Sequence, residues 1–289
     1  MCDEHFEEDV KKYLRQQGMT RRQFGALAAA AGFAAVLPHA ANAQTVSGSD
    51  VMVQTPDGVA DAYFVHPVSG THPAVLIWPD AMGLRTSFKG MATRLAESGY
   101  AVLVVNPYYR NAQAPVVPDG SDFGSVRDVL DPLMGSLNSE THVTDALAFV
   151  GWLDNQAAVD TSRKVGTMGY CMGGPMTMRT AAVLPNRVGA GASFHGGGLA
   201  TDADDSPHLL VPQMQAGFLI AIAANDDERD PQAKVTLRQA FDEAGLNAEI
   251  EVYAGTMHGW CPTDSAVYHP EQAERAWSRM LALFDRALV

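Results

Sequence analysis

The most restrictive feature of this sequence is a regular alternation of short apolar runs with helical stretches. The run A-V-L-I-W at Ala74–Trp78 lies between two prolines, and a second apolar run covers residues 100–106. Continuous runs of this length are typical of strands that are buried on both faces of a parallel sheet. Further strands are predicted at residues 164–169, Val188–Phe194, 218–223 and 249–253, and helices at residues 88–97, 141–153, 174–184, 232–244 and 270–288.

This alternation predicts an α/β fold with a largely parallel, twisted sheet and helices on both faces. An antiparallel strand is expected at residues 60–66, where side chains alternate after the turn signal Pro56-Asp57-Gly58. Residues 107–138 are rich in Pro, Gly and Asp, and we expect an irregular insertion there with one short helix. In such sheets the ligand site lies outside the carboxyl ends of the strands.

Residues 1–43 have the pattern of a twin-arginine export signal. Arg21 and Arg22 precede the apolar run 25–37, and Ala41-Asn42-Ala43 offers a cleavage site after Ala43. An amphipathic helix is the alternative interpretation. The apolar run is too short to span a bilayer comfortably, so no stable membrane span is expected after cleavage. We therefore predict one domain at 44–289, export by the twin-arginine machinery, and a periplasmic or secreted location.

Charge and composition narrow the classes of partner. The chain carries a net charge of −13, which repels nucleic acid and anionic membranes. Residues 1–43 contain five basic and five acidic residues, so cleavage leaves this net charge unchanged. At 47% hydrophobic residues, the chain is long and apolar enough for one sizeable core. A small-molecule partner fits these properties better than a polyanion.

Three chemistry-bearing residues follow predicted strands. Cys171 follows the strand at 164–169, Asp226 follows 218–223, and His258 follows 249–253. Because parallel strands end at the same edge of a sheet, we expect these side chains to meet there. Their order is nucleophile, acid, histidine, which is the order of the triad in α/β-hydrolases, with Cys in the serine position.

The segment Gly169-Tyr170-Cys171-Met172-Gly173 fits the nucleophile-elbow pattern G-x-[S/C]-x-G. Small flanking residues allow the sharp turn from strand to helix, and the N-terminus of the following helix favours a thiolate. The N–H of Met172 is then a candidate oxyanion donor. Two alternatives remain, a structural cysteine and a disulfide with Cys261.

The remaining members of the predicted site are less specific in sequence. His258 lies between Thr256-Met257 and Gly259, as expected for a loop that presents an imidazole as general base. Asp226 is nearest its strand end, and Asp227 is the runner-up for the acid. The histidines at 66, 72, 142, 208 and 269 are expected to face solvent.

The loop after the strand Ala74–Trp78 is expected to supply the second oxyanion donor. That donor would be the N–H of Ala81, and Asp80 beside it would tune the thiol. The alternative role of Asp80 is to cap the helix that begins near Thr86 or Ser87.

Together these motifs resemble the dienelactone hydrolase family (carboxymethylenebutenolidase-like), a branch of the α/β-hydrolases. The resemblance rests on Gly169–Gly174, Asp226, His258-Gly259, Asp80–Gly83 and Pro107–Arg110, and it covers roughly all of 44–289. It implies the α/β-hydrolase fold and hydrolysis of a lactone through an acyl-enzyme on Cys171.

The resemblance also implies substrate-binding residues. Family members often have Glu where this chain has Asp80, and their arginines bind the substrate carboxylate, a role that Arg110 could match. His195 takes the place of a common aromatic residue, and with Trp260 it is expected to line the pocket. No cofactor is expected, and no His, Cys and Asp cluster has metal-ligand spacing.

A cysteine nucleophile favours activated substrates, because thiolate is also a good leaving group. A stabilised enolate departs more easily than thiolate, whereas simple alkoxides and amines do not. We therefore predict hydrolysis of an activated lactone or ester. The alternatives are an exported redox-active protein that uses Cys171 and Cys261, and a binding protein that retains the hydrolase fold.

Overall fold

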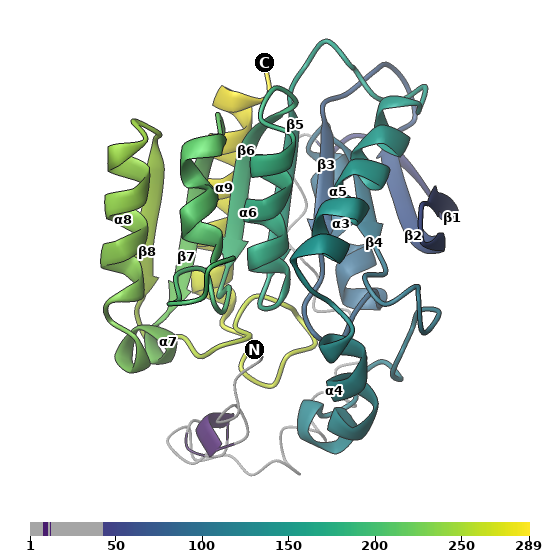
Figure 1. The fold of residues 1–289 in the computed structure, drawn as a ribbon. Helices are drawn as coiled ribbons and strands as arrows, with labels where there is room; N and C mark the ends of the chain where they lie inside the picture. Colours follow the sequence, from purple (N-terminus) through teal and green to yellow (C-terminus); the bar gives the residue numbers. More distant parts are fainter. Residues whose placement is uncertain (1–7, 11, 13–42) are drawn as a thin grey trace.

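An eight-stranded sheet forms the centre of the molecule in the computed structural model, which describes residues 8–10, 12 and 43–289. The strand order is β1-β2-β4-β3-β5-β6-β7-β8 (Figure 1). The β1–β2 and β2–β4 pairs are antiparallel, and every pair from β4 to β8 is parallel. The predicted α/β fold with a largely parallel sheet is thereby confirmed.

The strands agree closely with the apolar runs that predicted them. Every residue of β3, β4 and β5 is buried, as expected for strands covered on both faces. The eight strands are β1 Val46–Thr55, β2 Gly58–Pro67, β3 Ala74–Trp78, β4 Ala101–Val105, β5 Val165–Tyr170, β6 Val188–Phe194, β7 Gly217–Ala223 and β8 Ala248–Tyr253.

Helices cover both faces of the sheet. Apolar residues of α3 and α9 share one core cluster, while α5, α6 and α8 contribute to two clusters on the opposite face (Figure 1). The helices are α3 Thr86–Glu97, α4 Arg127–Gly135, α5 Ser139–Asp154, α6 Gly173–Val183, α7 Ala224–Arg229, α8 Ala233–Glu243 and α9 Pro270–Ala287, with 3₁₀ turns η1 Phe123–Val126 and η2 Pro207–Gln213. In the described part of the chain, none of them is long and apolar enough to cross a membrane.

Three elements differ from the sequence predictions. Strand β1 was not predicted, because most of its residues are exposed and polar and its stability comes from the hairpin with β2. The segment 107–138 contains both η1 and α4 rather than one short helix. The six-residue helix α7 directly follows β7, so Asp226 lies in its first turn.

Candidate active site

Cys171 lies in the sharp turn between β5 and α6. Its φ angle is 51°, a left-handed conformation that is rare for a residue with a side chain, and 7% of its surface is exposed. The Cys171 N–H donates to the carbonyl of Phe194 at 3.0 Å, which extends the pairing of β5 with β6 by one residue. The position of Cys171 is thus fixed at the carboxyl edge of the sheet.

The glycines of this turn are required by close backbone contacts. A Cβ atom at Gly169 would lie 2.0 Å from the carbonyl oxygen of Gly173, and one at Gly173 would lie 2.4 Å from that of Trp78. A Cβ at Gly174 would lie 2.7 Å from the Cα of Gly196. The first turn of α6 therefore packs directly against β3, β5 and the loop after β6.

His258 and Asp226 form a hydrogen-bonded pair beside the turn. Nδ1 of His258 lies 2.8 Å from Oδ2 of Asp226, and the His258 N–H donates to Oδ1 of Asn225 at 2.8 Å. Asp226 and Asn225 belong to α7, so this short helix holds both the ring and the backbone of His258. With Nδ1 bonded to the carboxylate, Nε2 is left to act on the thiol.

The electrostatics of His258 favour its protonated form. Burial acts to lower the pKa of His258, but Cys171 and Asp226 together raise that pKa well above its ordinary value, through charge and side-chain hydrogen bonds. A raised histidine pKa beside a thiol is the setting of a thiolate–imidazolium pair. The sequence-predicted Cys171, Asp226 and His258 therefore meet in one constellation.

Asp227, the alternative candidate for the acid, binds a different residue. Oδ2 of Asp227 accepts a bond from Nζ of Lys234 at 2.6 Å, on the side of α7 that faces α8. The geometry of the pair with His258 favours Asp226.

Ala81 and Met172, the expected oxyanion donors, lie on facing loops. Tyr108, three residues after the end of β4, donates from its hydroxyl to the carbonyl of Ala81 at 2.8 Å, and the same hydroxyl oxygen lies 3.3 Å from Sδ of Met172. Within the part of the chain that the structure describes, neither the Ala81 nor the Met172 N–H has a hydrogen-bond partner. The bridging role of Tyr108 was missed, although an aromatic residue in the loop that follows a central strand was a usable signal.

Asp80 is engaged by Arg85. Its two carboxylate oxygens accept from Nη1 and Nη2 of Arg85 at 2.7 and 3.0 Å, and Oδ1 also accepts from the N–H of Met82. Asp80 does not cap α3, whose N-cap position is Arg85 without a side-chain cap bond, so that alternative was wrong. Its predicted influence on the thiol stays a prediction.

Arg85 also binds a second carboxylate, which sequence reasoning did not find. Its Nε and Nη2 donate to Asp264 at 2.6 and 3.1 Å, and Nη1 donates to the carbonyl of Gly83. Arg85 is only 5% exposed. A buried guanidinium therefore joins the loop of Ala81 to the loop that follows His258, across 179 positions of sequence.

His195 packs against His258. Its ring centroid lies 5.0 Å from that of His258 at an angle of 67°, and 6.4 Å from that of Trp260. Burial, and then the charge of His258, hold the pKa of His195 well below its ordinary value. Its φ angle of 41° is also left-handed. Trp260 is fully buried and stacks on Tyr253, so the two expected pocket residues lie together beside His258.

Arg110 points away from this group. Its guanidinium donates to both oxygens of Asp145 at 2.9 and 2.7 Å and to Asp57 at 2.6 Å. Arg110 is thus already paired with two carboxylates. Its predicted role in substrate binding stays a prediction.

One histidine prediction was wrong. His142 was expected to face solvent, but it is 9% exposed within α5, and Nη1 of Arg179 lies 3.4 Å from its Nδ1. Burial and the neighbouring Arg179 lower the pKa of His142 to about 3.

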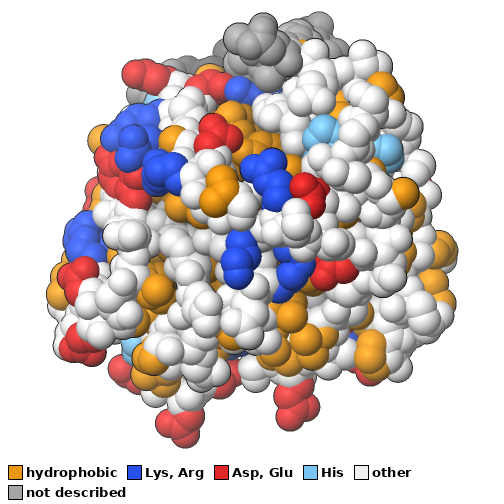
Figure 2. Space-filling view, turned by 90° about the horizontal axis from the view of Figure 1, so that it is seen from above, with side chains coloured by type: hydrophobic (Ala, Val, Ile, Leu, Met, Phe, Trp, Pro, Cys, Tyr) orange, Lys and Arg blue, Asp and Glu red, His pale blue; other side chains and the backbone are white. Residues whose placement is uncertain are grey.

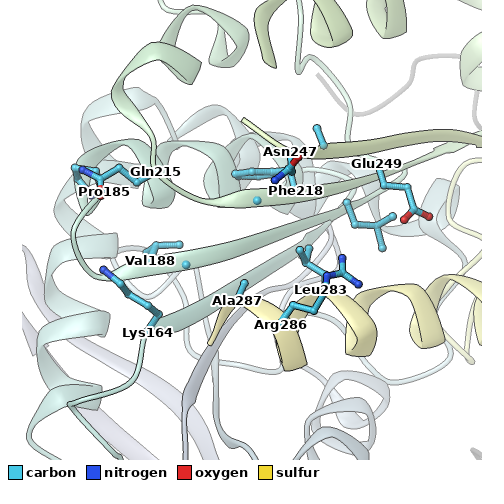
Figure 3. A pocket seen from close by; sticks show the side chains of 14 residues that line it. Lys164, Pro185, Val188, Gln215, Phe218, Asn247, Glu249, Leu283, Arg286 and Ala287 are labelled. Carbon is cyan, nitrogen blue, oxygen red and sulfur yellow. The ribbon is translucent and has the colours of Figure 1, made fainter. Parts of the chain in front are cut away.

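The two buried cysteines Cys171 and Cys261 form no disulfide with each other. No group of three or more potential metal ligands occurs among the described residues. A cavity of about 770 Å³ lies at the amino ends of β6, β7 and β8, the edge opposite Cys171 (Figure 3). Lys164, Phe218 and Arg286 line it, and it is separate from the candidate site.

The described part of the N-terminal segment contacts α7 and the loop after His258. Oδ2 of Asp9 accepts from Nδ2 of Asn225 at 2.9 Å and also pairs with Arg229. Val10 is 3% exposed and packs against Val267. The predicted signal at 1–43 otherwise lies outside the described residues.

The sheet and its helices define the α/β-hydrolase fold. Among solved structures, a "Putative Dienelactone Hydrolase" from Klebsiella pneumoniae superposes with a TM-score of 0.73 at 23% identity, covering 84% of this chain and 100% of that one. The family model "Dienelactone hydrolase family" matches residues 60–288, and the chain belongs to this family.

Two relatives extend this comparison. A "Putative carboxymethylenebutenolidase" from Methylorubrum extorquens is 26% identical over 287 residues, covering 95% of this chain and 96% of the relative. A "Probable 2-oxo-3-(5-oxofuran-2-ylidene)propanoate lactonase" from Bradyrhizobium is 26% identical over 225 residues, covering 76% and 86%. This chain is accordingly a dienelactone hydrolase-like hydrolase.

Proposed function

We propose that this protein hydrolyses activated lactones or esters through an acyl-enzyme on Cys171. The observation that carries the proposal is the hydrogen-bonded pair of His258 and Asp226, whose imidazole interacts with the Cys171 thiol. The names of the relatives, a carboxymethylenebutenolidase and a lactonase, support this substrate class.

The reaction divides into two steps. In the first, His258 takes the thiol proton, the Cys171 sulfur attacks the carbonyl carbon, and the resulting oxyanion accepts bonds from the N–H groups of Ala81 and Met172. The carbon–oxygen bond then breaks, and His258 returns the proton to the departing oxygen. In the second step, His258 activates a water that attacks the thioester, which releases the acid and restores the thiol. Asp226 orients His258 and stabilises its cation throughout.

The test is the Cys171→Ala variant assayed on p-nitrophenyl acetate and on a panel of enol lactones and aryl esters. Wild-type protein should hydrolyse at least one member, and the variant should lose that activity. Intact-mass measurement after rapid quenching should detect an acyl adduct on Cys171. Full activity of Cys171→Ala would contradict the mechanism.

Thiol titration of denatured, non-reduced protein should find Cys171 and Cys261 both reactive, which separates hydrolysis from the redox alternative.

We further propose that residues 1–43 direct export to the periplasm and are cleaved after Ala43. The twin arginine at Arg21 and Arg22 and the small residues at 41–43 support this. Mass spectrometry of the protein recovered from a bacterial periplasm should find a chain that begins at Gln44. Recovery of the uncleaved chain from the cytoplasm alone would contradict it.

A further inference from the structure

We propose that this site selects electrically neutral lactones or esters and disfavours substrates that carry a carboxylate. The inference rests on the proposed hydrolysis at Cys171. It concerns the charge of the substrate, which the triad itself does not determine.

The starting point is the set of cations at the carboxyl edge of the sheet. A carboxylate bound beside Cys171 would need a partner from the loops that leave this edge. These loops contain three Lys or Arg residues: Arg85, Arg110 and Arg229. Two further cations reach the loops from helices and pair with their carboxylates, Arg179 of α6 with Asp205 and Lys234 of α8 with Asp227. The loops in question are residues 79–85, 106–122, 171–172, 195–206, 224–232 and 254–269.

In the full-length chain all three loop cations have carboxylate partners. Those of Arg85 and Arg110 lie within residues 44–289, whereas Asp9, the partner of Arg229, would be removed by cleavage after Ala43. Arg85 directs four N–H···O bonds to Asp80 and Asp264, and a fifth to a backbone carbonyl. Arg110 binds Asp145 and Asp57. Redirecting Arg85 to a substrate would remove the partner of Asp80 and Asp264, whose side chains are 13% and 15% exposed. Redirecting Arg110 would remove the partner of Asp145, whose side chain is 2% exposed. Leaving such a group buried without a partner is costly.

The third cation is paired at a different place. Arg229 lies at the end of α7 and forms an ion pair with Asp9 of the N-terminal segment. The side chain of Arg229 is 31% exposed, so this pair is weaker than those of Arg85 and Arg110. It is therefore the contact to vary in the test.

The surrounding charge also opposes an anion. The same loops contain eleven Asp or Glu residues, including Asp202, Asp204 and Asp205 in the loop that follows His195. On the opposite edge, which Figure 2 views from above, Lys and Arg side chains lie among Asp and Glu side chains, and Lys164 and Arg286 line the cavity there. The field at the candidate site is thus negative, and it is strongest at low ionic strength.

The first experiment compares two substrates that differ only in charge. An enol lactone with a carboxymethylene substituent is assayed beside its primary amide, with wild-type full-length protein at about 0.01 M and about 0.15 M salt. We expect kcat/KM for the amide to exceed that for the carboxylate by about tenfold at low salt. The ratio should narrow as salt is raised, because the Debye length shortens. A preference for the carboxylate at both salt concentrations would overturn the inference.

Variants test the source of the selection. Asp202→Asn/Asp204→Asn removes two exposed carboxylates from the loop after β6, and it should raise kcat/KM for the carboxylate substrate about twofold to threefold at low salt. The amide should be unaffected. The matched control Asp242→Asn/Glu243→Gln removes two charges at the end of α8, on the opposite edge, and should change neither value. The variant Asp9→Asn removes the partner of Arg229 and so tests whether Arg229 can bind the substrate carboxylate. If Asp9→Asn raises kcat/KM for the carboxylate substrate more than Asp202→Asn/Asp204→Asn does, our account is contradicted.

Alkylation provides a readout that does not require turnover. Iodoacetamide is neutral and iodoacetate is anionic, and both form a thioether at Cys171 with loss of iodide. Relative to their rates with 2-mercaptoethanol, iodoacetamide should react with Cys171 at least several times faster than iodoacetate. Equal normalised rates would overturn the charge selection, even if no lactone is hydrolysed. Loss of all hydrolysis with retained alkylation selectivity would instead overturn the proposed function alone.

Discussion

Asp226 and Asp227 are neighbouring residues with different partners. Asp226 bonds Nδ1 of His258, and Asp227 bonds Lys234. The two Asp→Asn changes are therefore a matched pair. We expect Asp226→Asn to lower kcat/KM on an activated ester by about 10³-fold or more, because an amide neither fixes the ring tautomer nor stabilises the imidazolium. Asp227→Asn should lower kcat/KM by less than about threefold. An equal loss in both variants would argue against the assignment of the acid.

His142 offers a pH-dependent prediction. Its folded-state pKa of about 3 lies below that of the unfolded chain, so protons bind preferentially to the unfolded state between these values. The stability from neutral His142 is present above about pH 6.5 and is lost as pH falls. Asn can still accept from Arg179 and does not titrate. Between pH 7.5 and 4.5, urea denaturation should show His142→Asn losing about 2–3 kcal/mol less free energy of unfolding than wild type.

Parallel losses in the two proteins would show that His142 is protonated in the folded state. His142→Leu, which also lacks the titrating group, should show the same flatter pH dependence. It should be less stable than His142→Asn at every pH because Arg179 loses an acceptor.

At the scale of elements, the turn from β5 into α6 determines the site. Gly173 can be compared with Gly90, which lies inside α3 with no atom within 4 Å of an added Cβ. Gly173→Ala should lower the free energy of unfolding by about 2 kcal/mol or more, because its Cβ meets a backbone carbonyl of β3. Gly90→Ala should raise it by about 0.5–1 kcal/mol. Thermal unfolding followed by circular dichroism measures both, and a stable, active Gly173→Ala would contradict this packing.

The sequence was informative where local pattern and strand direction together determine position. Apolar runs locate β3, β4 and β7, and the shared direction of parallel strands brings Cys171 and His258 to one edge. The helix α7, which holds His258 through Asn225 and Asp226, was not predictable, because six residues with four charges show no helical periodicity. The bond of Arg85 with Asp264 and the hairpin strand β1 depend on partners that no local pattern specifies.

At the scale of the whole molecule, Asp9 and Val10, two described residues of the N-terminal segment, lie against α7 and the loop that follows His258. Val10 packs on Val267, and Asp9 shares Asn225 with the backbone of His258. In the full-length chain, Val10→Asp should release this segment, because a buried, unpaired carboxylate is unfavourable. We expect faster cleavage near Val10 by an added protease, and a changed kcat/KM, because Asn225 loses Asp9 and also holds the backbone of His258. The same substitution at Val289, which is 73% exposed, is the control and should change neither value.

The three triad members follow β5, β7 and β8, so they come from three successive parts of the chain. A nascent chain that has emerged as far as β6 already contains its thiol, yet the carboxylate and the imidazole are still missing. On the proposed mechanism, fragments that end before residue 258 have no hydrolytic activity. The onset of hydrolysis would report that the last strand has joined the sheet, which makes catalytic activity a direct measure of completed folding.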